Sequence, residues 1–223
     1  NKIYLINPKF TQSKRHSNNR LCLLLFSPEK CAMIILNLSK DVIIMNRYIA
    51  LLRGININGK NKISMAELKS VLNENDFIDV QSYLNSGNII FSTAINSEEI
   101  LAQKIKSLIA EHFGLDILVF IISQQDLADI LAHAPAWWGT ADQVIYDNLI
   151  FVLSSIAATD IAAKIGAPTA DLEQILIYEN VIFWSFDRKK YAKANWWKKT
   201  AQNGITEMLT IRTANTLRKI VNL

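Results

Sequence analysis

The chain has 223 residues, 50% of them hydrophobic and 20% charged, a composition that excludes a disordered or collagen-like protein. Its longest purely apolar runs have six residues, whereas a membrane-spanning helix needs about 20, which excludes an integral membrane protein. The formal net charge of +4 comes from residues 1–44, which carry seven basic and two acidic groups. Residues 45–223 carry 17 basic and 18 acidic groups. The overall charge therefore does not predict nucleic-acid binding.

The first 44 residues differ in kind from the rest. They contain both cysteines, Cys22 and Cys31, so residues 45–223 have no disulfide and no thiolate chemistry. The well-patterned sequence begins at Met45. We expect Met45 to be the natural start and residues 1–44 to be a disordered extension or a product of upstream translation; a targeting segment is the alternative.

Residues 45–135 show an order of strands and helices that defines a first subdomain. Strands are expected at 48–52, 80–84, 89–92 and 117–122. A helix begins at Ser64, whose capping box is completed by Glu67, and a second begins at Asn96 or Ser97 and ends at Gly114. The order β-α-β-β-α-β is the split βαβ, or ferredoxin-like, arrangement. A connecting helix then starts at Ser123.

Residues 136–223 repeat most of this order. Strands are expected at 149–153, 175–178 and 181–186, and helices at 159–165, 191–201 and 213–221. Trp137 and Trp138 lie near the boundary, and we expect them to anchor one half on the other. We therefore predict an α+β fold of two packed ferredoxin-like subdomains, related by duplication.

Three motifs resemble one known family. They are ALLRGININGKNK at 50–62, YLNSGNIIF at 83–91 and TIRTANT at 210–216. Together they resemble the bacterial domain of unknown function 1697 family over residues 46–223, while residues 1–44 resemble nothing in it. The resemblance implies a small cytoplasmic protein of two ferredoxin-like subdomains, and it implies no activity.

The loop 53–62 is the strongest candidate site in the sequence. It is longer than most strand-to-helix loops, and it places three cations beside a helix N-terminus, where a phosphate or carboxylate binds well. We therefore predict a small anionic, phosphorylated or nucleotide-like ligand there. The ligand-binding candidates are Arg53, Asn56, Lys60, Asn61, Lys62 and Arg212. The structural alternative is a loop folded over the sheet, with both asparagines bonded to backbone and the lysines solvated.

Other polar groups near the motifs are secondary candidates for the same site. They are Ser86, Asn88, Thr210, Asn215 and Lys219. Each also has a structural interpretation, since Ser86 and Asn88 suit a hairpin turn while Thr210 or Thr213 could cap the last helix.

A basic, aromatic segment supports an alternative function. Trp196 and Trp197 lie among lysines and follow the basic run 188–190, so they could stack bases and neutralise phosphates of a nucleic acid. The structural alternative buries one tryptophan and solvates the lysines. The charge of residues 45–223 argues against nucleic acid unless the cations gather on one face.

The inventory of catalytic groups is thin. His112 and His133 each lack a second histidine one helical turn away, so we expect no metal and no cofactor. A non-catalytic or regulatory binding protein is therefore favoured, with an enzyme site between the subdomains as a further alternative. The sequence leaves the ligand and the oligomeric state open.

Overall fold

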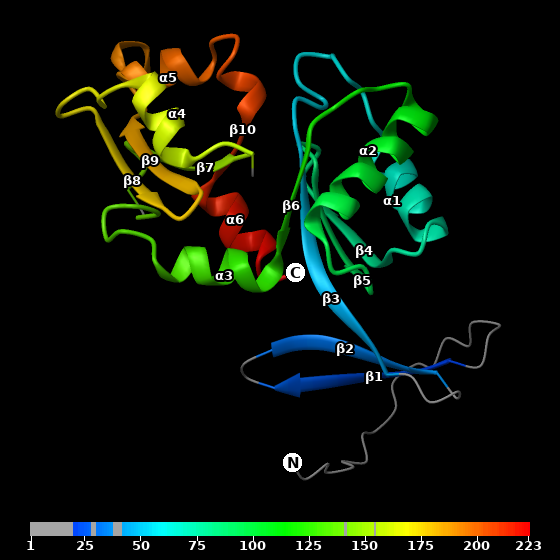
Figure 1. The fold of residues 1–223 in the computed structure, drawn as a ribbon. Coiled ribbons are helices and arrows are strands. Elements are labelled where there is room, and N and C mark those ends of the chain that lie inside the picture. The colour runs from blue at the N-terminus through cyan, green and yellow to red at the C-terminus, as the bar shows by residue number, and fades with distance from the viewer. Residues whose placement is uncertain (1–19, 28–29, 38–41, 141, 154) are drawn as a thin grey trace.

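A computed structural model describes residues 20–27, 30–37, 42–140, 142–153 and 155–223 of the chain (Figure 1). The first half of the fold alternates strands and helices as predicted. Its elements are β3 (Val42–Leu52), α1 (Met65–Glu74), β4 (Ile78–Tyr83), β5 (Asn88–Thr93), α2 (Glu98–Phe113), β6 (Val119–Ser123) and α3 (Gln124–Ala132). Strands β4, β5, β3 and β6 lie side by side in this order, every pair antiparallel. This is the ferredoxin-like order predicted from the sequence.

Capping residues set the ends of these helices. Ser64, Ser97 and Ser123 each accept a hydrogen bond from the backbone N–H three residues later. Helix α2 ends at Gly114, which adopts a φ of +64°. Helices α1 and α2 pack their buried faces on one side of the sheet, in a core that contains Leu68 and Phe91.

The second half repeats the first. Its elements are β7 (Ile145–Val152), α4 (Ala158–Ile165), β8 (Glu173–Tyr178), β9 (Val181–Asp187), the 3₁₀ helix η1 (Tyr191–Lys193), α5 (Asn195–Thr200), the 3₁₀ helix η2 (Thr206–Met208), β10 (Leu209–Thr213) and α6 (Ala214–Ile220). The sheet order is β8-β9-β7-β10, again antiparallel throughout. The predicted α+β class and the duplication of a ferredoxin-like unit are both confirmed.

Two details of the second half differ from the prediction. Strand β10 was not predicted, because it has only five residues and runs directly into a helix capped by Thr213. The single helix predicted at 191–201 is instead η1 followed by α5, with Ala194 extended between them.

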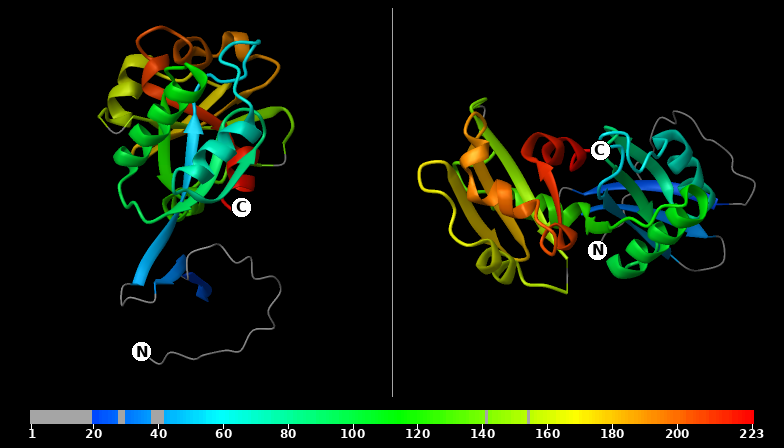
Figure 2. Two further views of the ribbon diagram at one scale, coloured as in Figure 1. Left: turned by 90° about the vertical axis from the view of Figure 1, so that its right-hand side faces the viewer. Right: turned by 90° about the horizontal axis from the view of Figure 1, so that it is seen from above.

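The two halves share a core that lies between their sheets. Helix α3 follows the last strand of the first half, and α6 follows the last strand of the second, so both enter the space between the sheets (Figure 2). This shared core contains residues of both sheets and of both helices, among them Ile49, Leu127, Phe183 and Leu217. Trp138 is 4% exposed within it and donates from Nε1 to the Asn148 carbonyl at 2.7 Å, as expected of an anchor between the halves.

The strand registers show which residues are equivalent in the two halves. Arg47 pairs with Ser92 across β3 and β5, and Asp147 pairs with Ser185 across β7 and β9. The side chains repeat the contact with opposite charge, since Arg47 donates to Ser92 Oγ while Ser185 Oγ donates to Asp147. Duplication therefore preserved the pairing of these positions and changed their chemistry.

Part of the N-terminal segment forms strands, which differs from the disorder expected for residues 1–44. Strands β1 (Arg20–Ser27) and β2 (Lys30–Asn37) form an antiparallel hairpin, and β2 pairs with the first residues of β3. The hairpin projects from the start of β3, away from the two helical layers (Figure 1). Both strands are apolar runs of strand length, which pair readily once a turn brings them together. The rest of the expectation for residues 1–44 lies outside the described residues.

Candidate functional site

The loop 53–62 is held by its asparagines. Asn56 donates to the carbonyls of Ile63 and Asn85 at 3.0 and 2.9 Å, and its Oδ1 accepts from the Ile63 N–H at 2.9 Å. Asn61 donates to the Gly54 carbonyl at 3.0 Å. These contacts correspond to the structural alternative for the asparagines, because their amide groups fold the loop onto itself and onto the β4–β5 turn.

Arg212 lies on β10 and reaches the first half of the fold. Its Nη2 donates to the Leu52 carbonyl at 2.6 Å, and its Nε donates to Asn88 Oδ1 at 2.6 Å. Further hydrogen bonds run to the Ser86 carbonyl at 3.2 Å and to Thr210 Oγ1 at 3.1 Å. Burial lowers the pKa of the Arg212 guanidinium to about 10. The N–H groups of Arg212, which we predict to bind an anion, therefore donate to oxygen atoms of the protein itself.

The β4–β5 turn fits under Arg212 because residue 87 is glycine. A Cβ at Gly87 would lie 2.6 Å from the Cβ of Leu52, and its φ of +80° disfavours any L side chain. The Gly87 carbonyl also accepts from the Leu52 N–H at 2.8 Å. The turn therefore packs directly against the end of β3.

The remaining predicted residues divide into two groups. Ser86, Asn88, Thr210 and Arg212 come together where the two halves meet. Arg53 also crosses between the halves, through its Nη2 to Thr206 Oγ1 at 2.6 Å. The exposed residues are Lys60, Lys62, Asn215 and Lys219. The structure thus unites three sequence motifs in a contact between subdomains and leaves the two loop lysines in solvent.

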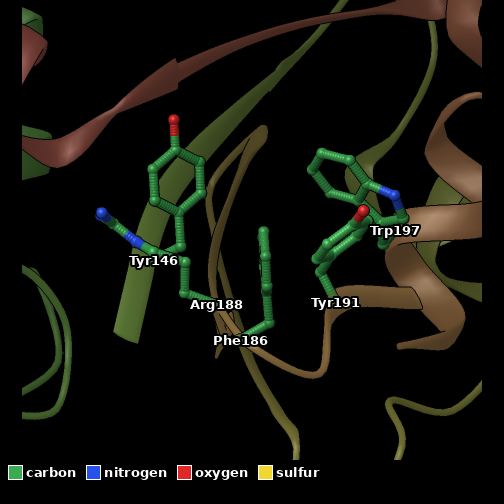
Figure 3. Close-up of a pocket in the computed structure, with 5 residues that line it drawn as sticks. All are labelled: Tyr146, Phe186, Arg188, Tyr191 and Trp197. Carbon is green, nitrogen blue, oxygen red and sulfur yellow. The ribbon is translucent and has the colours of Figure 1, made fainter. Parts of the chain in front are cut away.

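A pocket on the second half contains residues that the sequence did not single out together. We call it the aromatic basin; its cavity volume is about 320 Å³, and its lining is Tyr146, Phe186, Arg188, Tyr191 and Trp197 (Figure 3). The rings form a row, with centroids 5.5 Å apart from Tyr146 to Phe186 and 5.4 Å apart from Phe186 to Trp197. The last step, from Trp197 to Tyr191, is 5.1 Å. The Arg188 guanidinium lies 4.8 Å from the centre of the Tyr146 ring.

Secondary structure explains why one tryptophan is buried and its neighbour is not. Neighbouring residues on a helix point about 100° apart, so Trp196 and Trp197 cannot share a face. Trp196 is fully buried and donates from Nε1 to the Gly166 carbonyl, whereas Trp197 is 42% exposed at the edge of the basin. This confirms the structural interpretation of Trp196 and leaves Trp197 available for contacts.

Helix α5 is positioned by a buried carboxylate on a strand. Glu173 begins β8, and its two oxygens accept from the backbone N–H groups of Asn195 and Trp196 at 2.8 and 3.0 Å. The same carboxylate accepts from the Thr169 N–H and from Trp184 Nε1. Because α5 lacks a side-chain cap of its own, Glu173 supplies the acceptors that its first turn needs.

Basic side chains concentrate around the basin. Residues 187–199 carry six of the 17 basic groups of residues 45–223, with Asp187 as the one acidic residue among them. Five of the six are exposed, namely Arg188, Lys189, Lys190, Lys193 and Lys198. Among the described residues, only Lys190 of this group forms an ion pair, with Asp187. The gathering of cations that nucleic-acid binding requires is therefore present locally, despite the net charge of the two halves.

A second, polar pocket occupies the equivalent place in the first half. Tyr146 of the basin pairs with Phe186 across the strands, as Asn46 of the polar pocket pairs with Thr93. The cavity measures about 410 Å³, and its lining is Asn46, Arg47, Tyr48, Asn96, Glu98, Ser123, Gln125 and Asp126.

The polar groups of this second pocket bond mainly to one another. Tyr48 donates to Asn96 Oδ1 at 2.9 Å, and Glu98 accepts from the Ser123 N–H at 3.1 Å. Burial and the nearby charge of Asp126 raise the pKa of Glu98. These contacts join β3 and the end of β6 to the start of α2, so the basin is the better candidate for a ligand.

Sequence reasoning found one end of the basin and missed the other. It identified Trp197 and the basic run, but Tyr146 and Phe186 lie about 40 residues apart and meet only through the β7–β9 pairing. A row of aromatic residues on neighbouring strands is visible only once the register is known.

The comparisons with known proteins agree with the fold. Residues 45–183 match the family described as protein of unknown function (DUF1697). A conserved bacterial protein from Streptococcus pneumoniae, of known structure, is 31% identical over 80% of this chain and 98% of its own, with a TM-score of 0.69. No curated protein matches the chain.

The family match covers only part of the site. It ends within β9, so among the basin residues it includes Tyr146 and none of the other four. In the part of the chain that the structure describes, none of the helices has the length and apolar character needed to cross a membrane. On the match over residues 45–183, the chain belongs to the DUF1697 family.

Proposed function

We propose that this protein binds a nucleotide-like ligand at the aromatic basin, in a binding rather than a catalytic role. The observation that carries the proposal is the row of rings, in which Tyr191 and Trp197 are 46% and 42% exposed beside the Arg188 guanidinium. Exposed rings in contact with one another offer flat apolar faces, on which a base stacks with about 1–3 kcal/mol. The cations of residues 187–199 would then neutralise the phosphate.

The chemistry of the lining favours a base over other aromatic-site ligands. Aromatic cages that hold quaternary ammonium groups depend on a surplus of ring faces and no competing cation. Here Arg188 already lies against Tyr146, and further exposed basic residues lie in the segment 187–199 that carries Tyr191 and Trp197. A positively charged ligand would be repelled, whereas a ligand with an aromatic ring and a negative charge matches both parts of the site.

The anion site predicted at the loop 53–62 is a second proposal. Its support is now confined to Lys60 and Lys62, which are exposed on a loop whose shape the asparagines fix just before α1. Arg212, Asn56 and Asn61 contribute to it only as supports of the loop, because their polar groups contact protein atoms. The loop is the weaker of the two sites for this reason.

Binding titrations with two probes test both sites. We expect AMP, measured by calorimetry, or fluorescein-labelled hexathymidylate, measured by anisotropy, to bind the wild-type protein. Trp197→Ala should weaken that binding about tenfold or more, because a stacking face is lost. The matched control is Leu176→Ala, a residue of the same sheet that is 41% exposed.

The outcomes separate the two sites. Loss of binding in a Lys60→Ala/Lys62→Ala double variant, with Trp197→Ala unaffected, would place the ligand at the loop and contradict the basin. Absence of binding by both probes would show that the proposed function is wrong.

A further inference from the structure

We infer that the occupant of the aromatic basin is a stretch of single-stranded nucleic acid rather than a free nucleotide or a duplex. This inference rests on the proposed function and names the class of ligand within it. Its basis is the spread of the accessible rings: Tyr146 lies on one side of the buried Phe186 ring, and Tyr191 with Trp197 lies on the other. Together these three rings offer more stacking area than one base can cover.

The rings come from separate segments, which makes the row a surface rather than a closed cavity. Tyr146 lies near the start of β7, and Phe186 lies near the end of β9. Tyr191 belongs to η1 and Trp197 to α5. In Figure 3 the Phe186 ring stands between Tyr146 on one side and Tyr191 with Trp197 on the other. Different bases of an unpaired strand could stack on Tyr146 and on Tyr191 with Trp197, and pass over the buried Phe186 between them.

Exposure argues against a free nucleotide. Pockets for small molecules bury about 70–90% of the ligand surface. The two rings that close one end of the row are each more than 40% exposed, and the cavity of about 320 Å³ is near the lower limit for such pockets. A mononucleotide there would remain largely in water, whereas a strand gains a contact at each accessible ring.

Charge supports a strand in the same way. A basic residue lies at each end of the row, since the Arg188 guanidinium lies over the Tyr146 ring and Lys198 directly follows Trp197 in the chain. Cations at both ends suit a ligand with several phosphates in sequence. A duplex does not fit, because its bases are stacked on each other and cannot present their faces to protein rings.

The test is a length series of thymidylates of one, three, six and twelve nucleotides, with a twelve-base-pair duplex and hexauridylate as further probes. We expect the dissociation constant to fall at least about tenfold from one to six nucleotides. The duplex should bind more weakly than the hexamer at equal salt. Binding of hexauridylate or hexathymidylate supports the inference, and the tighter of the two indicates RNA or DNA.

Two variants test the arrangement of stacking and charge. Tyr191→Ala should weaken hexamer binding without changing the salt dependence, because it removes a ring and no charge. Arg188→Ala should lower the slope of the logarithm of the binding constant against the logarithm of salt by about 0.7, as expected for one lost phosphate contact to a single strand. Leu176→Ala remains the control for both.

Three results would overturn the inference. Equal affinity for mononucleotide and hexamer would leave the proposed function intact but make the ligand a free nucleotide. Equal or tighter binding of the duplex would indicate a purely electrostatic surface. No binding by any probe would overturn the inference and the proposed function together.

Discussion

Arg212 is a single residue that joins the two halves of the molecule. All three of its guanidinium nitrogens donate to protein oxygens, two of them to the first half. Its charge has no carboxylate partner within the described residues, so the carbonyl dipoles of the β4–β5 turn and of Leu52 take that place. An arginine suits this role because its planar fork reaches several acceptors at once.

Replacing Arg212 should therefore destabilise the fold rather than abolish binding at a distant surface. We expect Arg212→Met to lower the free energy of unfolding by about 3 kcal/mol, because it leaves the Leu52 carbonyl and Asn88 Oδ1 without their donor. Urea unfolding followed by circular dichroism measures the change, with the exposed Lys219→Met as control. A value within about 0.5 kcal/mol of wild type would contradict this role.

The sequence predicted some residue roles and not others for a clear reason. Caps act within three residues of themselves, so Ser64 and Ser123 could be assigned from spacing alone, and the caps Ser97 and Thr213 could each be narrowed to two candidates. The partners of Arg212 in the first half lie more than 120 residues away. In the sequence, an arginine in a polar motif with no acidic residue beside it suggests an anion site. The backbone carbonyls that bind it become visible only in the fold.

Helix α5 shows how one element depends on another for its place. It has six residues, too few to be stable alone, and its first backbone N–H groups bond to Glu173 of β8. Trp196 fixes one face of α5 in the core, which presents Trp197 to the basin. The aromatic basin thus depends on a carboxylate that does not line it.

Loss of that carboxylate should disturb α5 before the rest of the sheet. We expect Glu173→Ala to cost about 3 kcal/mol of unfolding free energy, since four donors lose a charged acceptor. The near-ultraviolet circular dichroism of the tryptophans should weaken in parallel. The neighbouring, exposed Gln174→Ala is the matched control, and an unchanged tryptophan signal in Glu173→Ala would argue against the anchor.

Elements were predictable where their pattern is periodic. The strands and helices of the first half follow from apolar spacing, and β8 and β9 follow from their short turn. Strand β10 escaped detection because it is short and is followed without a turn by the first residue of α6. The β1–β2 hairpin was missed because a segment expected to lie outside the domain was not considered for sheet pairing.

The whole molecule consists of two copies of one unit, and each copy contributes one helix to a common core. Each sheet has its own helices on its outer face, and α3 and α6 fill the space between the sheets. Neither half can bury its inner face alone. The first half would expose Ile49, Leu51, Ile90 and Ile122 if the second were absent.

This arrangement predicts that the two halves bind each other when they are made as separate chains. Residues 45–135 alone should bind a hydrophobic dye such as ANS, because an apolar face is uncovered. Mixing with residues 136–223 should suppress the dye signal and give a one-to-one complex by light scattering. Separate halves that stay monomeric after mixing would contradict a shared core.

The position of α6 in the chain also bears on how the protein is made. Leu217 and Ile220 complete the core between the sheets, and Arg212 completes the contact at the β4–β5 turn. Strand β3, which they help to cover, is synthesised about 160 residues earlier. During synthesis, the inner face of the first sheet therefore stays incompletely covered until α6 has left the ribosome, and premature stop codons a few residues upstream of residue 220 should send the product to chaperones or proteases.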